Sequence, residues 1–299
     1  MIKLKINNQD VEVESGSTIL DAAHKLNIDI PTFCYDERLK SDGACRMCVV
    51  EQIGSDKLLA SCAVPASSGL NILTHSDKVI QARKETLELT WASHPNECVV
   101  CDVNGDCKLQ DYMYEYDINA KPIYDGHQRL FEIDDSNKFF YIDPEKCILC
   151  GKCVRVCSEL QGYEALGYNK RGFKTFISFA FDQGMDFSNC VSCGNCVTSC
   201  PTGALVEKRN IKFKPSEVTK TRTTCPYCGV GCQFDLHVKD NTVVKITGAN
   251  VVPNDGLLCV KGKFAYKYIN HKNRLTTPLI KENGVFKEAT WEEAYSLIL

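Results

Sequence analysis

Cysteine is the residue type that decides what chemistry this chain can do. Its 299 residues include 19 cysteines, and all of them fall into five groups along the chain. An odd number of thiols argues against a framework of disulfides, whereas thiolates bind zinc and iron–sulfur clusters. The second group has only three cysteines, but His94 stands four residues before Cys98. Nineteen thiols and one imidazole make twenty donors, or five sets of four.

Two stretches repeat one pattern, Cys-x2-Cys-x2-Cys-x3-Cys, over Cys147–Cys157 and Cys190–Cys200, and Pro201 follows the second. This is the run of bacterial two-cluster ferredoxins, in which the fourth cysteine binds the other cluster. Zinc is the alternative, but its two knuckles are usually a dozen or more residues apart. We therefore predict two [4Fe-4S] sites. Their ligands are Cys147, Cys150, Cys153 and Cys200 in one site, and Cys190, Cys193, Cys196 and Cys157 in the other.

The first group is spaced more widely, and it consists of Cys34, Cys45, Cys48 and Cys62. Before it, apolar residues alternate over 4–13 around a predicted turn at 7–10, and Ser17 or Thr18 can cap a helix from residue 19. This start predicts a small β-grasp domain. Such a group can hold a [2Fe-2S] cluster, although its spacing differs from the plant-type run. A zinc ribbon fits less well, because Cys34 and Cys62 have no cysteine nearby.

The second group needs a fourth donor, and imidazole is a competent one. His94 precedes Pro95, which keeps residue 94 extended after a helix predicted over 77–92. We predict a [4Fe-4S] site whose ligands are His94, Cys98, Cys101 and Cys107. The alternative is a purely structural histidine, which is what we expect of His24, His75, His127, His237 and His271.

The last group, with Cys225, Cys228, Cys232 and Cys259, is not a third ferredoxin repeat, because its close thiolates use x2 and then x3 spacing. A β-hairpin is predicted beside it, since apolar residues alternate on both sides of Asp240-Asn241. The chain then reaches the segment Cys259-Val260-Lys261-Gly262.

Composition excludes several classes of function. Hydrophobic residues make up 44% and charged residues 24%, as in ordinary globular proteins. A net charge of -3 with no basic block argues against a nucleic-acid partner. No apolar run reaches the roughly 18 to 20 residues of a membrane span, and residues 1–8 have no apolar core of a secretory signal. We expect a cytoplasmic protein with no membrane span.

Taken together, these motifs resemble a known family. The chain is similar to the N-terminal third of the catalytic (alpha) subunit of a cytoplasmic, NAD-linked formate dehydrogenase with a molybdenum or tungsten bis-pterin centre. The residues behind this are the first two groups, the ferredoxin pair, and Cys225-Pro-Tyr-Cys-Gly-Val-Gly-Cys232 followed by Cys259-Val260-Lys261-Gly262. The front end also resembles the complex I large subunit and [FeFe]-hydrogenases.

The expected fold is an α+β multi-domain iron–sulfur protein. Its predicted units are a [2Fe-2S] β-grasp domain (1–78), a helical [4Fe-4S] unit with one His and three Cys ligands (79–119), a two-cluster ferredoxin domain (138–209) and the start of a molybdopterin oxidoreductase domain (218–299). Residues 121–138 read as a connecting segment, because turn-forming residues are frequent there.

The resemblance implies one [2Fe-2S] and four [4Fe-4S] clusters, the last of them at the Cys225 group. It also implies a Mo- or W-bis-molybdopterin guanine dinucleotide in the full-length subunit. Lys261 would then relay electrons between the last cluster and a pterin; the alternative is a solvated lysine. The implied partners are flavin- and NAD-binding diaphorase-type subunits, with ferredoxin as a second acceptor.

The residues that this family uses on formate would lie beyond residue 299. Thr290 to Glu293 form a capping box that opens an apolar helical face, and the chain stops soon afterwards. We therefore expect a fragment or a truncated reading frame that does not oxidise formate alone. The alternatives are an electron-transfer adaptor complete at 299 residues, a nitrate reductase and an [FeFe]-hydrogenase subunit.

Overall fold

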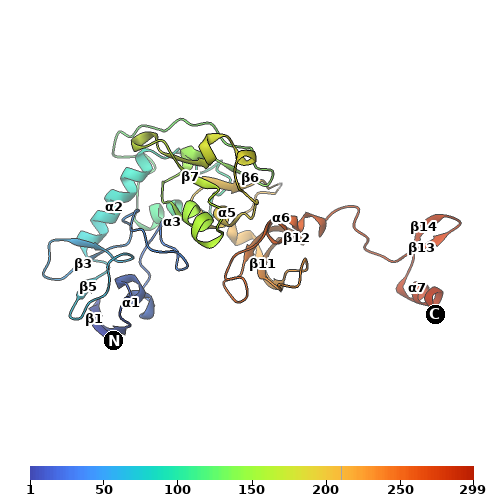
Figure 1. Cartoon of the computed structure of the whole chain (residues 1–299), viewed down its shortest axis with the longest axis horizontal. Helices are drawn as coiled ribbons and strands as arrows, with labels where there is room; N and C mark the ends of the chain where they lie inside the picture. Colours follow the sequence, from blue (N-terminus) through green and yellow to red (C-terminus); the bar gives the residue numbers. More distant parts are fainter. Residues whose placement is uncertain (210) are drawn as a thin grey trace.

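The computed structural model describes residues 1–209 and 211–299 and has an α+β architecture of successive units (Figure 1). The helices are α1 (Ile19–Lys25), α2 (Asp77–Ala92), α3 (Lys108–Glu115), α4 (Lys152–Arg155), α5 (Asn195–Ser199), α6 (Val260–Phe264) and α7 (Trp291–Ile298). The strands are β1 (Ile2–Ile6), β2 (Gln9–Val13), β3 (Val49–Gln52), β4 (Leu58–Ala60), β5 (Asn71–Leu73), β6 (Phe140–Ile142), β7 (Leu166–Asn169), β8 (Phe176–Phe179), β9 (Leu205–Glu207), β10 (Thr219–Thr224), β11 (Gln233–Lys239), β12 (Thr242–Gly248), β13 (Leu279–Glu282) and β14 (Val285–Glu288). Within this described part, none of the helices has the length and apolar character of a membrane span.

The N-terminal unit is a five-stranded sheet with the order β2-β1-β5-β3-β4. β1 pairs antiparallel with β2 and parallel with β5, so the sheet is mixed. The turn between β1 and β2 is tighter than the predicted turn at 7–10, because β2 already begins at Gln9. Asn7 and Asn8 both have positive φ (49° and 65°), which allows a two-residue hairpin loop that matches the twist of the strands.

Helix α1 covers this sheet, and Thr18, rather than Ser17, is its N-cap. The Thr18 side chain accepts from the Asp21 N–H, and the Asp21 carboxylate accepts from the Thr18 N–H. This reciprocal capping box satisfies two N–H groups that the first turn would leave unpaired. The helix then buries Ile19 and Leu20 in the core beneath the sheet.

Helix α2 begins and ends at the predicted residues and joins the first unit to the second. Ser76 caps it by accepting from the Val79 N–H. Arg83 is fully buried, and its guanidinium donates to the Val49 carbonyl (2.8 Å) and the Tyr116 hydroxyl (3.0 Å). One helix therefore holds a strand of the sheet and the end of α3 in fixed positions.

The ferredoxin-like unit contains two short antiparallel pairs, β6-β9 and β7-β8, and two short helices, α4 and α5. Each helix begins directly after a left-handed glycine, Gly151 (φ 70°) or Gly194 (φ 73°). A Cβ on Gly151 would lie 2.1 Å from the Tyr168 hydroxyl oxygen, so a side chain at this left-handed position would be strained and would displace Tyr168.

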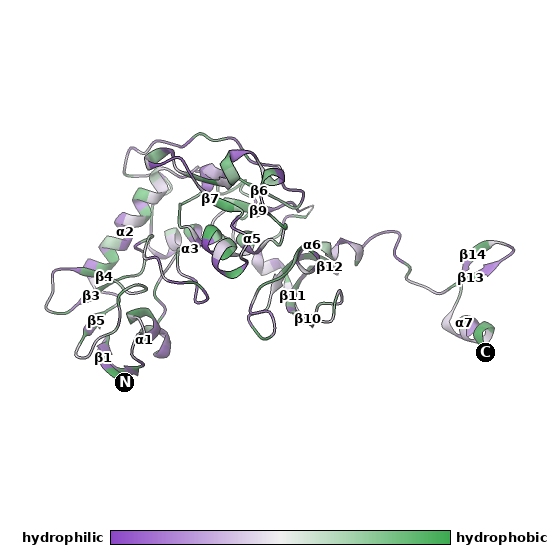
Figure 2. Cartoon of the chain, viewed as in Figure 1, coloured by the Kyte–Doolittle hydropathy of each residue, from purple (hydrophilic) through white to green (hydrophobic). Residues whose placement is uncertain are grey.

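The C-terminal unit is a three-stranded antiparallel sheet, β10-β11-β12, followed by α6. The predicted hairpin is present as β11 and β12, and its turn residues Asp240 and Asn241 have positive φ. The chain then continues to the β13-β14 hairpin and α7, which stand apart from the rest in Figure 1. The predicted capping box at Thr290 is confirmed. Figure 2 shows hydrophobic residues on α7, and Trp291 and Leu297 there are exposed.

Candidate metal centres

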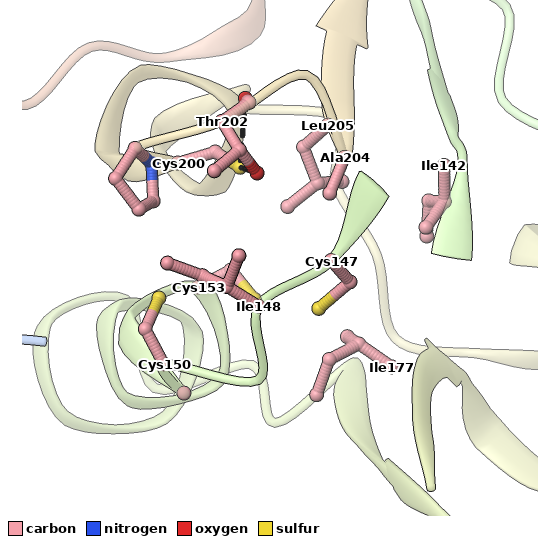
Figure 3. Close-up of a pocket in the computed structure, with 12 residues that line it drawn as sticks. Ile142, Cys147, Ile148, Cys150, Cys153, Ile177, Cys200, Thr202, Ala204 and Leu205 are labelled. Atoms are coloured by element: carbon pink, nitrogen blue, oxygen red, sulfur yellow. Dashed lines mark hydrogen bonds between the residues drawn. The ribbon is translucent and has the colours of Figure 1, made fainter. Parts of the chain in front are cut away.

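One predicted set of ligands surrounds a cavity in the ferredoxin-like unit (Figure 3). Cys147, Cys150 and Cys153 come from the loop and first turn of α4, and Cys200 follows α5. In Figure 3 their side chains face one central space, with Cys200 across from Cys150. About 390 Å³ of space without protein atoms lies between these residues, and part of it is open to solvent. The remaining lining is largely apolar and includes Ile142, Ile148, Ile177, Ala204 and Leu205.

The second set surrounds a neighbouring cavity of about 360 Å³. Cys190, Cys193 and Cys196 belong to the second cysteine run, and Cys157 is the last cysteine of the first run. Each cavity thus has three cysteines from one run and the fourth from the other, which is the arrangement of a two-cluster ferredoxin.

Backbone N–H groups point at the sulfur atoms of both runs. The Leu149 N–H donates to Cys147 Sγ at 3.3 Å, and the Ser192 N–H donates to Cys190 Sγ at 3.4 Å. Leu149 and Ser192 stand at the same position of the repeat, and both have positive φ (54° and 55°). The repeated sequence therefore produces a repeated strained loop. Such N–H groups stabilise negative charge on sulfur.

Burial makes the bare thiols poor acids. It raises the pKa of Cys147 to about 11 and that of Cys150 to about 12. Burial also raises the pKa of Cys153 well above its usual value. Only thiolates bind iron, so the positive charge of bound metal must offset this desolvation. We therefore expect metal binding and folding of this unit to be coupled.

The histidine set surrounds a third cavity, with about 320 Å³ of empty space and with His94, Cys98, Cys101 and Cys107 in its wall. His94 Nδ1 lies 3.0 Å from the Pro95 carbonyl oxygen. A carbonyl can only accept, so Nδ1 carries the proton and Nε2 has the free lone pair. Nε2 is buried and has no hydrogen-bond partner among the described residues. Burial also lowers the pKa of His94, which favours the neutral ring that a metal requires.

The orientation of the His94 ring is fixed by its neighbours. The ring stacks on Trp91 with centroids 5.7 Å apart and an interplanar angle of 21°. The Trp91 indole N–H in turn donates to the Ala120 carbonyl at 3.0 Å. A metal-binding histidine is usually held by a hydrogen bond from its other nitrogen, as the Pro95 carbonyl does here. The donor set, the orphaned Nε2 and the cavity together fit a metal cluster.

The structure also brings the first cysteine group together, in the N-terminal unit. The N–H groups of Phe33 and Cys34 approach Cys45 Sγ at 3.4 and 3.5 Å. Cys48 Sγ lies 3.2 Å from Cys62 Sγ. Three of these thiols are buried and Cys45 is half-buried, so a metal centre here would be largely shielded from water.

The last group lies at the surface of the C-terminal unit. The Cys225 N–H donates to the Cys232 carbonyl at 2.8 Å, which closes the loop of the three near cysteines. Burial and then the charges of Cys225, Cys228 and Cys259 raise the pKa of Cys232, as expected for four neighbouring thiols. Cys228 and Cys259 are exposed, and Lys261 is exposed on α6.

The side chains of three predicted ligand sets are spread around cavities rather than gathered at one position. Among residues 1–209 and 211–299, no three His, Cys, Asp or Glu side chains are grouped so that they could hold one metal ion. In a [4Fe-4S] cluster each protein ligand binds a different iron atom, so the ligands stand apart around the cluster.

Four known domain families match successive parts of the chain. They are the 2Fe-2S iron-sulfur cluster binding domain (1–77), the NADH-ubiquinone oxidoreductase-G iron-sulfur binding region (83–122), the 4Fe-4S dicluster domain (146–204) and the molybdopterin oxidoreductase Fe4S4 domain (218–271). In this order, the four matched domains make up a region similar to the N-terminal iron–sulfur region of a molybdopterin oxidoreductase alpha subunit. The predicted α+β multi-domain iron–sulfur fold is confirmed.

Full-length relatives of this alpha-subunit region have several names. The NADPH-Fe(3+) oxidoreductase subunit alpha of Geobacter sulfurreducens is 37% identical over 98% of this chain and 34% of its own length. The NADH-quinone oxidoreductase subunit 3 of Thermus thermophilus is 33% identical over 99% of this chain and 42% of its own length. A Staphylococcus aureus protein named "Putative formate dehydrogenase" is 29% identical over 98% of this chain and 34% of its own length. The chain thus spans less than half the length of each of these relatives.

A solved structure is also similar to this chain. A chain of the NAD+-reducing [NiFe]-hydrogenase in the H2-reduced state superposes with a TM-score of 0.66 and 30% sequence identity, covering 72% of this chain and 90% of that chain. The prediction of an iron–sulfur, electron-transferring subunit of an oxidoreductase is therefore confirmed. Formate as the substrate stays a prediction, because the relatives' names differ.

Sequence reasoning missed the residues that join the units to one another. Arg155, on α4, donates to the carbonyl oxygens of Lys40 (2.8 Å) and Cys34. Arg38 donates to the Asp255 carbonyl at 2.8 Å and so links the N-terminal unit to the C-terminal unit. These contacts join residues more than a hundred positions apart, so no local spacing could have indicated them.

Proposed function

We propose that the chain conducts electrons, through one [2Fe-2S] and four [4Fe-4S] centres, between a Mo or W bis-pterin site in the full-length subunit and a flavin- and NAD-binding partner. The proposed units are 1–78, 79–119, 138–209 and 218–299. The proposed ligands are Cys34, Cys45, Cys48 and Cys62 for [2Fe-2S]; His94, Cys98, Cys101 and Cys107; Cys147, Cys150, Cys153 and Cys200; Cys190, Cys193, Cys196 and Cys157; and Cys225, Cys228, Cys232 and Cys259. The observation that carries this proposal is the set of three similar cavities, each lined by four proposed donors.

The proposed His94 site and the proposed Cys147 site lie close together. A Cβ on Gly203, near the end of the ferredoxin run, would lie 3.0 Å from Cys101 Sγ. Lys146, next to Cys147, lines the His94 cavity. Iron–sulfur clusters take up and release single electrons, at potentials set by ligand type, hydrogen bonds to sulfur and burial. The protein's part is to bury the thiols, aim N–H groups at them and keep neighbouring sites close.

We propose formate as the substrate of the full-length subunit, with electrons leaving through the N-terminal unit to a diaphorase-type partner or to ferredoxin. The motif at Cys225 to Lys261 and the staphylococcal relative support formate. The exposed Lys261, two residues after Cys259, would relay electrons to a pterin. We place the chain in the cytoplasm, because a reducing compartment keeps its thiols available.

A second candidate function is oxidation or reduction of a pyridine nucleotide with a different electron partner. Two relatives that are 37% and 33% identical to this chain have names with NADPH-Fe(3+) or NADH-quinone oxidoreductase, and both are more similar than the formate-named relative. The iron–sulfur part of the proposal is the same in both cases.

Iron and acid-labile sulfide analysis, with EPR of the reduced chain, tests the common part. The proposed centres predict about 18 irons per chain, from one [2Fe-2S] and four [4Fe-4S] clusters. Few irons with stoichiometric zinc would overturn the proposal. Formate-dependent reduction of the full-length subunit then tests the substrate. Reduction by NAD(P)H but not by formate would favour the second candidate.

A further inference from the structure

One buried side chain, that of Asn195, makes two hydrogen bonds from the ferredoxin-like unit to the C-terminal unit. Asn195 lies between the proposed ligands Cys193 and Cys196 and is only 4% exposed. Its Nδ2 donates to the Leu258 carbonyl at 2.9 Å, and the Leu258 N–H donates to its Oδ1 at 3.1 Å. Leu258 directly precedes Cys259. Two hydrogen bonds therefore tie the loop of one proposed site to a ligand segment of the next.

The ferredoxin loop itself does not require an asparagine there. The equivalent position of the first repeat, between Cys150 and Cys153, is Lys152. Its ammonium group makes no hydrogen bond or ion pair with the described residues, and its side chain lines a different cavity, between the units. The two repeats have the same loop conformation at Gly151 and Gly194. The asparagine side chain also interacts with the Cys193 thiol, but its two hydrogen bonds to Leu258 have no counterpart at Lys152.

Packing around Asn195 makes this contact close. Phe264, at the end of α6, lies over Gly194 so tightly that a Cβ there would be 2.4 Å from Phe264 Cζ. The Phe264 ring stacks on Phe139 with centroids 5.0 Å apart and an interplanar angle of 10°. Nearby, the Tyr266 hydroxyl donates to the buried Glu207 carboxylate at 2.9 Å. The interface is thus filled by aromatic rings and satisfied polar groups.

We propose that Asn195 is a positioning residue that fixes the distance between the Cys190 site and the Cys225 site. The second ferredoxin site is then the one that exchanges electrons with the Cys225 site. This inference rests on the proposed function, because it needs clusters at both places. Replacing Asn195 leaves a buried N–H and a buried C=O of Leu258 without partners, so the segment that carries Cys259 must shift.

The test is EPR of the dithionite-reduced, iron-loaded full chain, with iron content measured in parallel. The readout is the broadening of the EPR signal by spin–spin coupling between the Cys225 centre and its neighbour. Loss of this broadening in Cys228→Ser assigns it to the Cys225 centre. Asn195→Leu, which keeps the volume but not the hydrogen bonds, should lose this broadening at wild-type iron content. Asn195→Asp keeps the acceptor for the Leu258 N–H and should lose part of it.

Asn254→Ala is the matched control. Asn254 hydrogen-bonds Gln233 and Leu257 within the C-terminal unit, so it supports the same segment without crossing to the ferredoxin-like unit. This variant should keep the broadening, and a loss equal to that of Asn195→Leu would overturn the inference. Unchanged broadening in Asn195→Leu would also overturn the inference. If Asn195→Leu loads no iron, unchanged broadening in Asn195→Asp would overturn it instead. Low iron in the wild-type chain would instead refute the proposed function.

Discussion

At the scale of single residues, His94 shows how the chain selects a ligand. A carbonyl acceptor on Nδ1 and burial of Nε2 leave one unprotonated nitrogen facing three thiols. Neither feature is chemically unusual alone. Together they leave an unsatisfied buried nitrogen, which is costly unless something binds it.

Replacing this ligand should affect one centre only. We expect His94→Ala to lose or alter the EPR signal of a single [4Fe-4S] centre, while the other signals persist. His94→Cys should restore the iron content but lower the reduction potential of that centre, because a thiolate adds negative charge. Exposed His271→Ala is the control. Unchanged spectra and iron content in His94→Ala would contradict the ligand assignment.

A second histidine makes stability depend on pH. His237 is buried in β11, and burial, together with nearby lysines, lowers its pKa from 6.5 to about 4. As the pH falls, the unfolded chain therefore binds this proton at a higher pH than the folded chain does. The contribution of His237 to the free energy of unfolding is complete above pH 6.5 and is lost progressively toward pH 4. By pH 5.5 the loss should be about 1.4 kcal/mol.

This pH dependence can be measured by urea unfolding of the chain at pH 7.5 and pH 5.5. His237→Gln removes the titrating group but retains a hydrogen-bonding side chain toward Thr247, which lies 2.9 Å from His237 Nε2. Between pH 7.5 and pH 5.5, the variant should lose about 1.4 kcal/mol less stability than the wild type. An identical loss in both proteins would show that His237 is not responsible.

At the scale of elements, α2 joins the first two units and depends on a buried cation. Arg83 is fully buried and satisfies the Val49 carbonyl and the Tyr116 hydroxyl, with no carboxylate paired to it in the described part of the chain. Its aliphatic stem also fills space between helix and sheet.

We expect Arg83→Ala to destabilise the chain by about 2–4 kcal/mol, because it leaves a cavity and two unpaired polar groups. Urea unfolding followed by tryptophan fluorescence would report this, since Trp91 lies on the same helix. Arg222→Ala is the matched control. Arg222 pairs with Asp235 on the surface, where such pairs contribute at most about 1 kcal/mol. Equal effects of the two substitutions would contradict the role given to Arg83.

At the scale of the whole molecule, the units are held together by side chains that reach between them. Arg155 contacts the carbonyl of Cys34, Arg38 contacts Asp255, and Lys245 pairs with Asp106 at 2.8 Å. Because these links close the chain on itself, the N-terminal unit has a fixed place next to the ferredoxin-like unit.

Removing residues 1–78 should abolish electron exchange with a flavin- and NAD-binding partner. The shortened chain should contain about 16 irons, two fewer than the full chain, and dithionite should still reduce the remaining centres. Stopped-flow reduction by the partner and NADH measures the exchange. Retained exchange at that iron content would place the exit of electrons elsewhere.

The sequence by itself determined the local features. The repeated run indicated the loops around Cys147 and Cys190, and capping residues indicated the starts of α1 and α7. Alternation of apolar residues indicated the β11-β12 hairpin. These depend on contacts within a few residues, so their signals are local. The tight Asn7-Asn8 turn was missed because either asparagine tolerates several turn types.

Only the tertiary structure decided how the sites stand toward one another. It left His94 Nε2 without a partner among the described residues and set Asn195 against Leu258. Asn195 and Lys152 occupy equivalent positions of one repeat, and nothing in the motif says which of them faces another unit. That choice depends on which surface each repeat turns toward the rest of the chain, and packing between distant segments sets it.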